Sequence, residues 1–411
     1  MKTMYDPFTQ DEYAKAEETF RESLALDASD PETNIMLGAC LARQGKFDEA
    51  ISYLTLGIEL STDEEERASV YAYLGDLYFA REEWKDAIEN YETAIRLSDV
   101  EKTTGNLFNL GLAYVNVEEY AKSEAAFREY LTLDPSNVDA NINLGTSLIR
   151  QGKADEAIRC YKKGMKLSTN DRECSFAYAN IGDAYFYLKD WKKSIKYYET
   201  AIRLSDEQKT AMNYFTIGFA YGALRENTKA EAAFRESLAL DPSDSETNNN
   251  LGNSLARQGK FDEAIHFYEI GIELSTDDEE RSIAYVNLGR MYEVREEWEK
   301  VIEHFENAIR LNELQKTVQN FFSIGIAYGK LKEDGKAAAA FRECLARDPT
   351  NIEAHINLGA SLANEGKFDE AMPYFKRGIE FGNKEERSFA SRNLEKLYAK
   401  RKKGRKNDEA G

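Results

Sequence analysis

Apolar residues along the chain recur at intervals of three and four residues, the spacing that places them on one face of an α-helix. Between Ser282 and Leu311, a first set of this kind consists of Tyr285, Leu288 and Tyr292. After a charged turn, a second set follows, made of Trp298, Val301, Ile302, Phe305, Ala308 and Ile309. The pattern predicts two amphipathic helices joined by a short turn, and it predicts such pairs along nearly the whole chain.

The pattern also repeats with a long period. Two sets of aromatic residues are spaced by 107 positions throughout, namely Phe20, Phe127, Phe234 and Phe341, and Trp84, Trp191 and Trp298. Inside each block of this length, an apolar residue followed by glycine recurs in steps of 37, 36 and 34 positions. These glycines are Gly38, Gly75, Gly111, Gly145, Gly182, Gly218, Gly252, Gly289, Gly325 and Gly359. One block therefore holds three helix pairs, of which two are expected to be lengthened by three and two residues in their final turns.

Small and helix-breaking residues occupy fixed places in each pair. Gly289 and its equivalents are expected where the second helix passes close to the first. Where a pair ends in Leu-Asp-Pro, as at Pro242, the proline stops the helix and polar residues after it can cap the next one. Gly45, Gly152 and Gly259 are expected to be left-handed helix C-caps. Neither helix can bury its apolar face alone, so each pair must stack on its neighbours.

Together these residues resemble the tetratricopeptide repeat, a helix–turn–helix repeat of about 34 residues. The likeness lies in Leu-Gly at the seventh and eighth positions, Tyr at the eleventh, Ala at the twentieth, Phe or Tyr at the twenty-fourth and, in some repeats, Pro at the thirty-second. Ten repeats fit between about Pro31 and about Arg387. The resemblance implies an all-α fold, a right-handed α-solenoid of about ten helix–turn–helix units arranged in the block of 107 positions.

The two ends of the chain differ from the repeats. Residues 1–30 are expected to form an N-terminal segment with a half-repeat capping helix, residues 31–387 the ten repeats, residues 388–399 a C-terminal capping helix and residues 400–411 a basic tail. Glu395 stands where the repeat has glycine. A carboxylate there cannot be covered by a following helix, so the last helix is expected to face solvent.

Charge and hydropathy exclude several classes of partner. Lys and Arg number 54 against 74 Asp and Glu, and a net charge of −20 argues against binding along nucleic-acid phosphates or an anionic membrane surface. No apolar stretch approaches the roughly 18 residues that span a bilayer, and no apolar segment is typical of a signal peptide. A cytoplasmic protein without membrane insertion is therefore expected. The basic run Lys400–Lys406 is either a solvated tail or a nuclear-import or nucleic-acid contact.

Residues able to carry chemistry are few. The cysteines, at 40, 160, 174 and 344, occupy non-equivalent repeat positions and are expected to fill the core in a reducing compartment. The three histidines show no metal-ligand spacing. The string from Gly38 to Lys46 superficially resembles a phosphate loop, but its glycine spacing is wrong and a helix precedes it. Trp84, Trp191 and Trp298 are expected to pack in the core. The sequence therefore predicts no enzyme, no cofactor and no small-molecule substrate.

Asparagine recurs immediately before the Leu-Gly pair. It occupies this position at Asn109, Asn143, Asn180, Asn250, Asn287 and Asn357, and at Asn393 in the last helix. Asparagine costs several tenths of a kcal/mol relative to alanine inside a helix, so seven occurrences need a reason. The resemblance implies that this face lines the concave groove, and the pattern is similar to the asparagine ladder of the O-GlcNAc transferase superhelix, which holds an extended peptide by its main chain. The residues leave open a second interpretation, that the amides bridge neighbouring repeats.

Other groove positions would supply specificity. The predicted aromatic groove residues are Phe176, Phe186, Tyr187, Phe215, Phe219 and Phe322. Arg150 and Arg257 recur near the groove rim, where each could hold an acidic side chain of a partner or a carboxylate of this chain. The chaperone-binding members of the family use cations that clamp a C-terminal carboxylate, and here those positions hold Asn249 and Gln319. Binding of a heat-shock chaperone C-terminus is therefore not expected.

The sequence thus predicts an adaptor or scaffold that binds an extended peptide segment of another protein in its groove. The alternative is an architectural scaffold that assembles with itself head to tail, because the blocks are nearly identical and each end resembles an internal junction.

Overall fold

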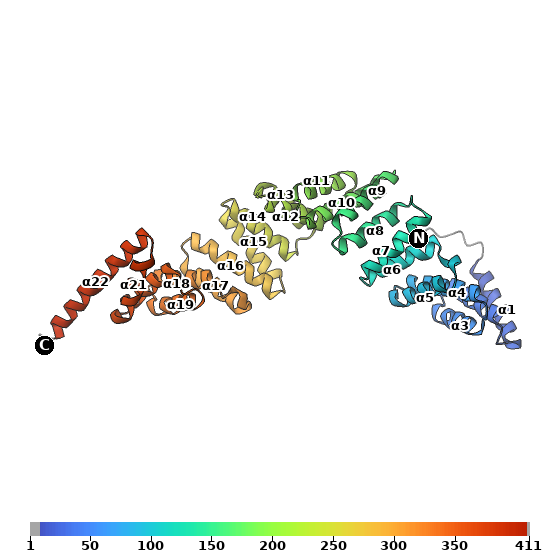
Figure 1. Ribbon diagram of the computed structural model, residues 1–411, viewed down its shortest axis with the longest axis horizontal. Helices are drawn as coiled ribbons and strands as arrows, with labels where there is room; N and C mark the ends of the chain where they lie inside the picture. Colours follow the sequence, from blue (N-terminus) through green and yellow to red (C-terminus); the bar gives the residue numbers. More distant parts are fainter. Residues whose placement is uncertain (1–8, 409–411) are drawn as a thin grey trace. The chain divides into compact units, whose positions relative to one another are not determined.

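The computed structural model describes residues 9–408, with side chains described as far as Ala399. All regular structure in this range is helical, which confirms the all-α prediction (Figure 1). The first helices of ten pairs are α2 (Pro31–Arg43), α4 (Glu64–Ala80), α6 (Thr104–Asn116), α8 (Val138–Arg150), α10 (Asp171–Tyr187), α12 (Ala211–Ala223), α14 (Ser245–Arg257), α16 (Asp278–Val294), α18 (Val318–Lys330) and α20 (Ile352–Asn364). Their second helices are α3 (Phe47–Leu60), α5 (Trp84–Leu97), α7 (Tyr120–Leu133), α9 (Ala154–Leu167), α11 (Trp191–Leu204), α13 (Asn227–Leu240), α15 (Phe261–Leu274), α17 (Trp298–Leu311), α19 (Asp334–Arg347) and α21 (Phe368–Phe381).

Two helices stand outside the pairs, α1 (Gln10–Leu26) and α22 (Lys384–Asp408), and three short 3-10 turns complete the structure, η1 (Asp99–Glu101), η2 (Asp206–Gln208) and η3 (Glu313–Gln315). The backbone of the basic run lies in α22, a helix longer than residues 388–399. The side chains of that run, and residues 1–8 of the expected N-terminal segment, lie outside the described part.

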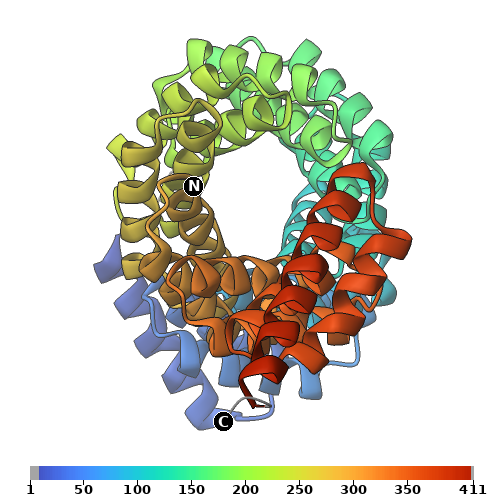
Figure 2. The same cartoon turned by 90° about the vertical axis from the view of Figure 1, so that its left-hand side faces the viewer.

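The chain divides into two compact units, of which the first ends at Lys209 and the second begins at Thr210. Within each compact unit, the two helices of a pair pack against each other and consecutive pairs lie side by side (Figure 2). Each compact unit is therefore a solenoid-like array of helix–turn–helix repeats.

The extra residues of the longer repeats lie outside the second helices. All ten second helices have 14 residues, so the expectation of lengthened final turns is wrong. Instead α4, α10 and α16 have 17 residues where other first helices have 13, and the 3-10 turns take up the remaining insertions. The side chain of Asp63 accepts the Glu65 amide 2.9 Å away, and the Ser61 hydroxyl binds Glu66. This cap starts α4 early because it satisfies amides that begin the helix.

Close helix packing explains the repeated glycines. A Cβ on Gly145 of α8 would lie 2.5 Å from Cε1 of Tyr161 in α9, and one on Gly75 would lie 2.7 Å from Cδ1 of Tyr91. The rings that occupy this place in nine pairs are nearly fully buried, namely Tyr91, Phe127, Tyr161, Tyr198, Phe234, Tyr268, Phe305, Phe341 and Phe375. The close passage expected at these glycines is confirmed.

The three tryptophans and two of the four cysteines lie at the edge of this core, where they are half-buried. Trp84 is half-buried and packs edge-on against Phe79, with ring centroids 5.2 Å apart. Cys40 and Cys344 are buried as expected, whereas Cys160 and Cys174 are half-buried. Burial raises the pKa of the Cys344 thiol to about 11, so this thiol is protonated and unreactive at neutral pH.

The turn inside each pair contains one residue in the left-handed conformation. Gly45, Gly152 and Gly259 have φ of 79°, 77° and 78°, which confirms their expected role. Six other turns place a non-glycine residue there, namely Glu82, Glu118, Lys189, Arg225, Glu296 and Lys332, with φ between 57° and 63°. Those six turns are strained, because a Cβ disfavours this conformation.

Lys189→Gly is expected to stabilise the protein by about 0.5–1 kcal/mol, since glycine adopts a positive φ without this cost. Urea unfolding followed by circular dichroism measures the change. Gly152→Ala at the equivalent turn is the matched control and should destabilise by about 1 kcal/mol. Changes of the same sign for the two variants would contradict the assignment of strain.

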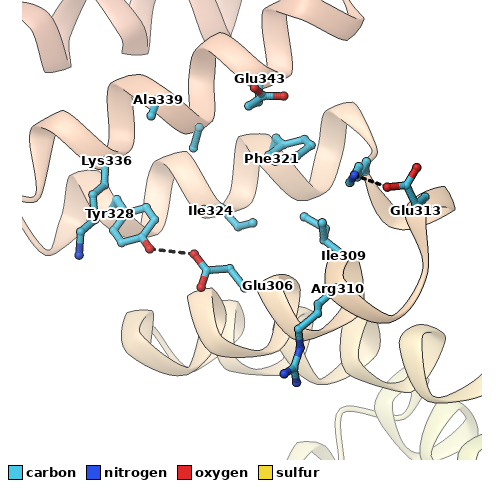
Figure 3. A pocket seen from close by; sticks show the side chains of 12 residues that line it. Glu306, Ile309, Arg310, Glu313, Phe321, Ile324, Tyr328, Lys336, Ala339 and Glu343 are labelled. Atoms are coloured by element: carbon cyan, nitrogen blue, oxygen red, sulfur yellow. Dashed lines mark hydrogen bonds and ion pairs between the residues drawn. The ribbon is translucent and has the colours of Figure 1, made fainter. Parts of the chain in front are cut away.

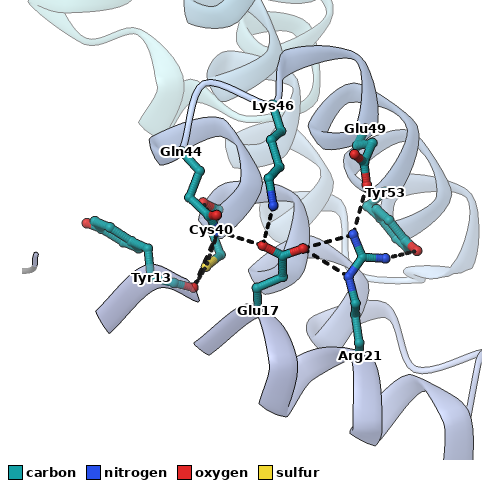
Figure 4. A network of polar contacts seen from close by, with 8 residues as sticks. All are labelled: Tyr13, Glu17, Arg21, Cys40, Gln44, Lys46, Glu49 and Tyr53. Carbon is teal, nitrogen blue, oxygen red and sulfur yellow. Dashed lines mark hydrogen bonds and ion pairs between the residues drawn. The ribbon is translucent and has the colours of Figure 1, made fainter. Parts of the chain in front are cut away.

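A polar network ties α1 to the turn of the following pair (Figure 4). One oxygen of Glu17 accepts from Lys46 Nζ at 2.7 Å and from Gln44 Nε2 at 2.9 Å, and the other lies 3.0 Å from Arg21 Nη2. The hydrogen bond from Lys46 is the main reason that the pKa of Glu17 falls to about 2. The same network forms around Glu124 in the next block and around Glu231 in the block after that. It joins the second helix of one repeat to the next repeat.

Candidate functional site

The described residues contain neither a helix that could cross a membrane nor a group of metal ligands. None of the described helices is both long enough and apolar enough to span a bilayer. Within the same part of the chain, no three His, Cys, Asp or Glu side chains come together as metal ligands. His304 stacks on Tyr292 with ring centroids 5.1 Å apart, and one ring nitrogen of His355 lies 2.9 Å from the Pro349 carbonyl oxygen. These two histidines therefore have packing partners inside the fold.

Two of the seven recurrent asparagines bridge repeats. Asn109 of α6 donates through Nδ2 to Tyr91 Oη at 3.1 Å and to Asp76 Oδ1 at 3.2 Å, both in the preceding pair. Asn287 of α16 donates to Asn253 Oδ1 of α14 at 3.1 Å. At these two positions the structure shows the bridging interpretation.

Three other asparagines bind their own helix. Asn143, Asn250 and Asn357 each donate Nδ2 to the backbone carbonyl four residues earlier, at 2.9 Å. Asn393 of α22 does the same, and Asn180 is half-buried on α10. The asparagines therefore do not form one uniform ladder. The bonds within the helix leave to Asn143, Asn250 and Asn357 the side-chain carbonyl oxygen as an acceptor and the second N–H of Nδ2 as a donor.

The predicted aromatic residues fall into two classes. Phe176 and Tyr187 of α10 are 43% and 63% exposed, and Phe219 of α12 is 38% exposed. By contrast, Phe186 is half-buried beside Trp191 at 5.2 Å, and the half-buried residues Phe215 and Phe322 pack on the second-helix rings Phe234 and Phe341 at 6.0 and 5.7 Å. Only the first class is available to a partner without rearrangement of the core.

The two predicted arginines differ in their surroundings. Arg257 is exposed, and its Nη1 lies 3.4 Å from the Gly222 carbonyl oxygen of the preceding first helix. Arg150 is also exposed. Burial raises the pKa of Asp183 above its usual value, against the opposing effects of the Tyr198 hydrogen bond and the Arg150 charge. Arg150 therefore acts electrostatically on a carboxylate of its own chain.

Two cavities share equivalent positions of the first helices, and the first of them also extends to α1 and α3. We call the first the apolar cavity; it has a volume of about 650 Å³ in the first compact unit and includes Ile35, Met36, Ala39 and Tyr73. We call the second the amide cavity; it has a volume of about 490 Å³ in the second compact unit and includes Asn249, Asn250, Asn253 and Asn287. Each residue of the second set lies 214 positions after its counterpart in the first. Within each compact unit, we use the term first-helix face for the surface formed by its first helices, which carries the apolar cavity, Phe176 and Tyr187 in the first unit and the amide cavity and Phe219 in the second.

Sequence reasoning identified only part of the amide cavity. The sequence predicts that Asn250 and Asn287 bind peptide and places Asn249 where chaperone-binding members of the family hold a cation, but it does not predict that Asn249 and Asn253 line a pocket with them. The signal that could have found them is the run Asn248–Asn253, in which only Leu251 and Gly252 interrupt the asparagines. Its significance depends on knowing which residues of α14 face α16.

A second pair of cavities lies between second helices. One, of about 580 Å³, lies among α17, α18 and α19, and Ile309, Ile324 and Tyr328 are among its apolar lining residues (Figure 3). Several polar groups around it have partners within the chain: Tyr328 donates to Glu306 at 2.8 Å, Lys336 binds Glu333 at 2.6 Å, and Arg310 donates to the Asn307 side chain at 2.9 Å. A cavity of about 640 Å³ occupies the equivalent place among α5, α6 and α7.

Comparison with known families agrees with this architecture. Tetratricopeptide repeat models match residues 29–99, 138–207, 173–243 and 244–314, which together exceed half of the chain. Further tetratricopeptide repeat models match residues 108–167, 318–351 and 340–372. The chain belongs to the tetratricopeptide repeat family.

Relatives of this repeat protein are distant. It is 21% identical over 403 residues to the TPR repeat-containing protein MJ1428 of Methanocaldococcus jannaschii, covering 92% of this chain and 69% of that one. It is 25% identical over 291 residues to the BBSome complex member BBS4 of Bos taurus, covering 64% of this chain and 55% of the relative. Among solved structures, the C-terminal part of a TPR repeat-containing protein from Cytophaga hutchinsonii is 20% identical, with a TM-score of 0.44, covering 70% of this chain and 99% of that one.

The family sets the general class of function. Tetratricopeptide repeat proteins mediate protein–protein interactions, and the bovine relative is named as a member of a complex. The chain spans about half of that relative's length.

Proposed function

We propose that the chain is a non-enzymatic adaptor whose first-helix face binds an extended segment of another protein. The observation that carries the proposal is the exposure of Phe176 and Tyr187 on α10. Most other aromatic rings of the fold are, by contrast, at least half-buried. Aromatic side chains on an open surface are typical anchors of protein interfaces. The cavities of the same face would supply pockets for further side chains of the segment.

The asparagines contribute to this binding at selected positions. Asn143, Asn250 and Asn357 each have a carbonyl oxygen that can accept a main-chain amide of the bound segment. Each such hydrogen bond contributes about 1 kcal/mol net, so these contacts add affinity with little sequence preference. Asn109 and Asn287 donate to the preceding repeat, so their amides also hold neighbouring repeats together. Aromatic anchoring is therefore the larger contribution.

A paired affinity capture from the source lysate, read by mass spectrometry, tests the proposal. The variant Phe176→Ala, Tyr187→Ala and Phe219→Ala is expected to lose a partner that the wild type retains, because all three side chains are exposed. The matched control is Val100→Ala, Leu240→Ala and Leu314→Ala, which removes three exposed apolar side chains elsewhere. Capture of the same partners by all three baits would contradict binding at the first-helix face.

Self-assembly is a second candidate, favoured by the exposure of α1 among the described residues. Phe127, Phe234 and Phe341 are buried beneath the first helix of their pair, whereas Phe20 of α1 is only half-buried and α1 contains no buried residue. Against head-to-tail stacking, the exposed Glu395 of α22 occupies the position that holds glycine in the pairs. Light scattering over a range of concentrations separates the candidates, since a rising mass supports self-assembly and a fixed monomer mass opposes it.

A further inference from the structure

We infer that the amide cavity binds an arginine or lysine side chain of the partner segment, a specificity that rests on the proposed function. The inference starts from the equivalent positions of the two cavities. Ile35, Met36, Ala39 and Tyr73 make the first cavity largely apolar, and all four are asparagine in the second. In the intervening block the same positions hold Ile142, Asn143, Thr146 and Asn180. Only α14 and α16 concentrate four amides at this place.

Hydrogen bonds fix the orientation of these amides. Asn250 donates to the Glu246 carbonyl oxygen at 2.9 Å, Asn287 donates to Asn253 Oδ1 at 3.1 Å, and Asn249 donates to Glu280 Oε1 at 3.0 Å. One N–H of each of these three amides therefore faces a protein acceptor, whereas Asn253 accepts through Oδ1 from Asn287 and from the Tyr268 hydroxyl. Among the described residues, no donor reaches the side-chain carbonyl oxygens of Asn250 and Asn287. The cavity consequently offers these carbonyl oxygens as acceptors, beside the N–H groups of its amides that are not used in these bonds.

The charges around the amides have one sign. Asp244, Glu246, Asp277, Glu279 and Glu280 line the cavity together with the asparagines, and its lining includes no lysine or arginine. A guanidinium or ammonium group is rich in donors and positively charged, so it satisfies both the amide oxygens and the carboxylates. Burial raises the pKa of Glu246, and Asp244 and Glu280 raise it further. The site therefore holds negative charge that its own residues leave unbalanced.

Asn249 gives independent support because it occupies an apolar slot. In the first compact unit, Ile35 lies against Gly57, with its Cγ1 2.5 Å from the place of a glycine Cβ. Asn249 lies in the same way against Gly271, and its Oδ1 is buried without a hydrogen-bond partner. Such an orphaned acceptor is unfavourable, and departures of this kind from local rules concentrate at functional sites. In return, the Nδ2 group of Asn249 donates the hydrogen bond that orients the Glu280 carboxylate beside the cavity.

A transplant variant separates amide recognition from general attraction to an acidic protein. It carries Asn249→Ile, Asn250→Met, Asn253→Ala and Asn287→Tyr, the residues that the chain itself uses in the apolar cavity. All substitutions exchange one neutral side chain for another, so the net charge remains −20. Circular dichroism and a thermal unfolding curve check the fold, and Asn250→Ala alone serves as a milder second variant.

The probe is a dye-labelled peptide, Gly-Ser-Ala-Arg-Ala-Ser-Gly with blocked ends, and its control contains citrulline, which is neutral, in place of arginine. By fluorescence anisotropy at fixed salt, the wild type should bind the arginine peptide about tenfold more tightly than the citrulline peptide, and the transplant variant should lose about tenfold in affinity for the arginine peptide. Asn250→Ala should lose a smaller factor. Equal affinities for the two peptides, equal affinities of wild type and transplant variant, or no binding would each overturn the inference.

A parallel capture distinguishes failure of this inference from failure of the proposed function. A partner retained by the transplant variant but lost with the Phe176, Tyr187 and Phe219 substitutions would leave the adaptor function standing and remove the cavity from recognition. A partner retained by both variants would contradict the adaptor function itself. A concentration-dependent mass that disappears in the transplant variant would place a second copy's basic run in the cavity and overturn the assignment to a partner protein.

Discussion

Gly325→Ala is expected to destabilise the protein by about 2 kcal/mol, because the added methyl group overpacks the contact between α18 and α19. Its Cβ would lie 2.6 Å from Cε1 of Phe341, well inside van der Waals contact. Phe341 is only 2% exposed and packs in a core with Phe322, so its ring has little room to move. Urea unfolding measures the loss as a lower midpoint.

The same helix provides the matched control. Gly329 lies one turn after Gly325, and a Cβ there would meet no heavy atom within 4 Å. Gly329→Ala should therefore stabilise by about 0.5–1 kcal/mol, because alanine favours the helix more than glycine does. Opposite signs for the two variants would show that packing, not helix propensity, requires Gly325. Destabilisation of similar size by both would refute this explanation.

Glu124→Ala should destabilise the junction between α7 and the turn before α9 by about 1–2 kcal/mol, since Arg128, Lys153 and Gln151 lose their common acceptor. The effect falls below that of a fully buried ion pair because Arg128 and Lys153 are 50% and 42% exposed. Urea unfolding at pH 7 measures it.

In the fourth block, the carboxylate that binds the lysine comes from a different position. There Ala338 replaces the glutamate and Glu365 replaces the glutamine, and the Glu365 carboxylate lies 3.1 Å from Lys367 Nζ. The double variant Glu124→Ala, Gln151→Glu should recover at least half of the lost stability, because the carboxylate is returned to Lys153 from the opposite side. A double variant no more stable than Glu124→Ala would contradict this account of the network.

The network also predicts a pH dependence. Burial, the largest single effect, raises the pKa of Glu124, but the bonds from Lys153, Arg128 and Gln151 together lower it to about 2. Because the ordinary value is 4.5, the unfolded chain takes up a proton first as the pH falls. The contribution of the ionised Glu124 to the free energy of unfolding is complete above about pH 4.5 and is lost as the pH falls towards 2. Unfolding midpoints measured across this window should fall less steeply for Glu124→Ala than for the wild type.

The candidate site was only partly predictable from the sequence. The position before Leu-Gly exists in every repeat, and helical spacing places it on one face of the first helix. Asparagine at this position identified Asn250 and Asn287 as candidate site residues. Sequence could not show that Asn287 donates to Asn253, that Asn250 donates to its own helix, or that Asn249 enters a slot occupied elsewhere by isoleucine. Those facts depend on the distance between α14, α15 and α16, which no local pattern specifies.

The sequence by itself determined the helix pairs and their stacking. Apolar spacing marked both helices of each pair, and the recurring glycine marked where a buried ring such as Tyr161 had to fit. These features are local or strictly periodic, so they can be recognised in the sequence alone. Only the tertiary structure decided where the inserted residues go, which aromatic rings remain exposed and which amide oxygens lack donors. Each of these depends on packing between helices distant along the chain, where the same residue type can be enclosed in one repeat and open to a partner in the next.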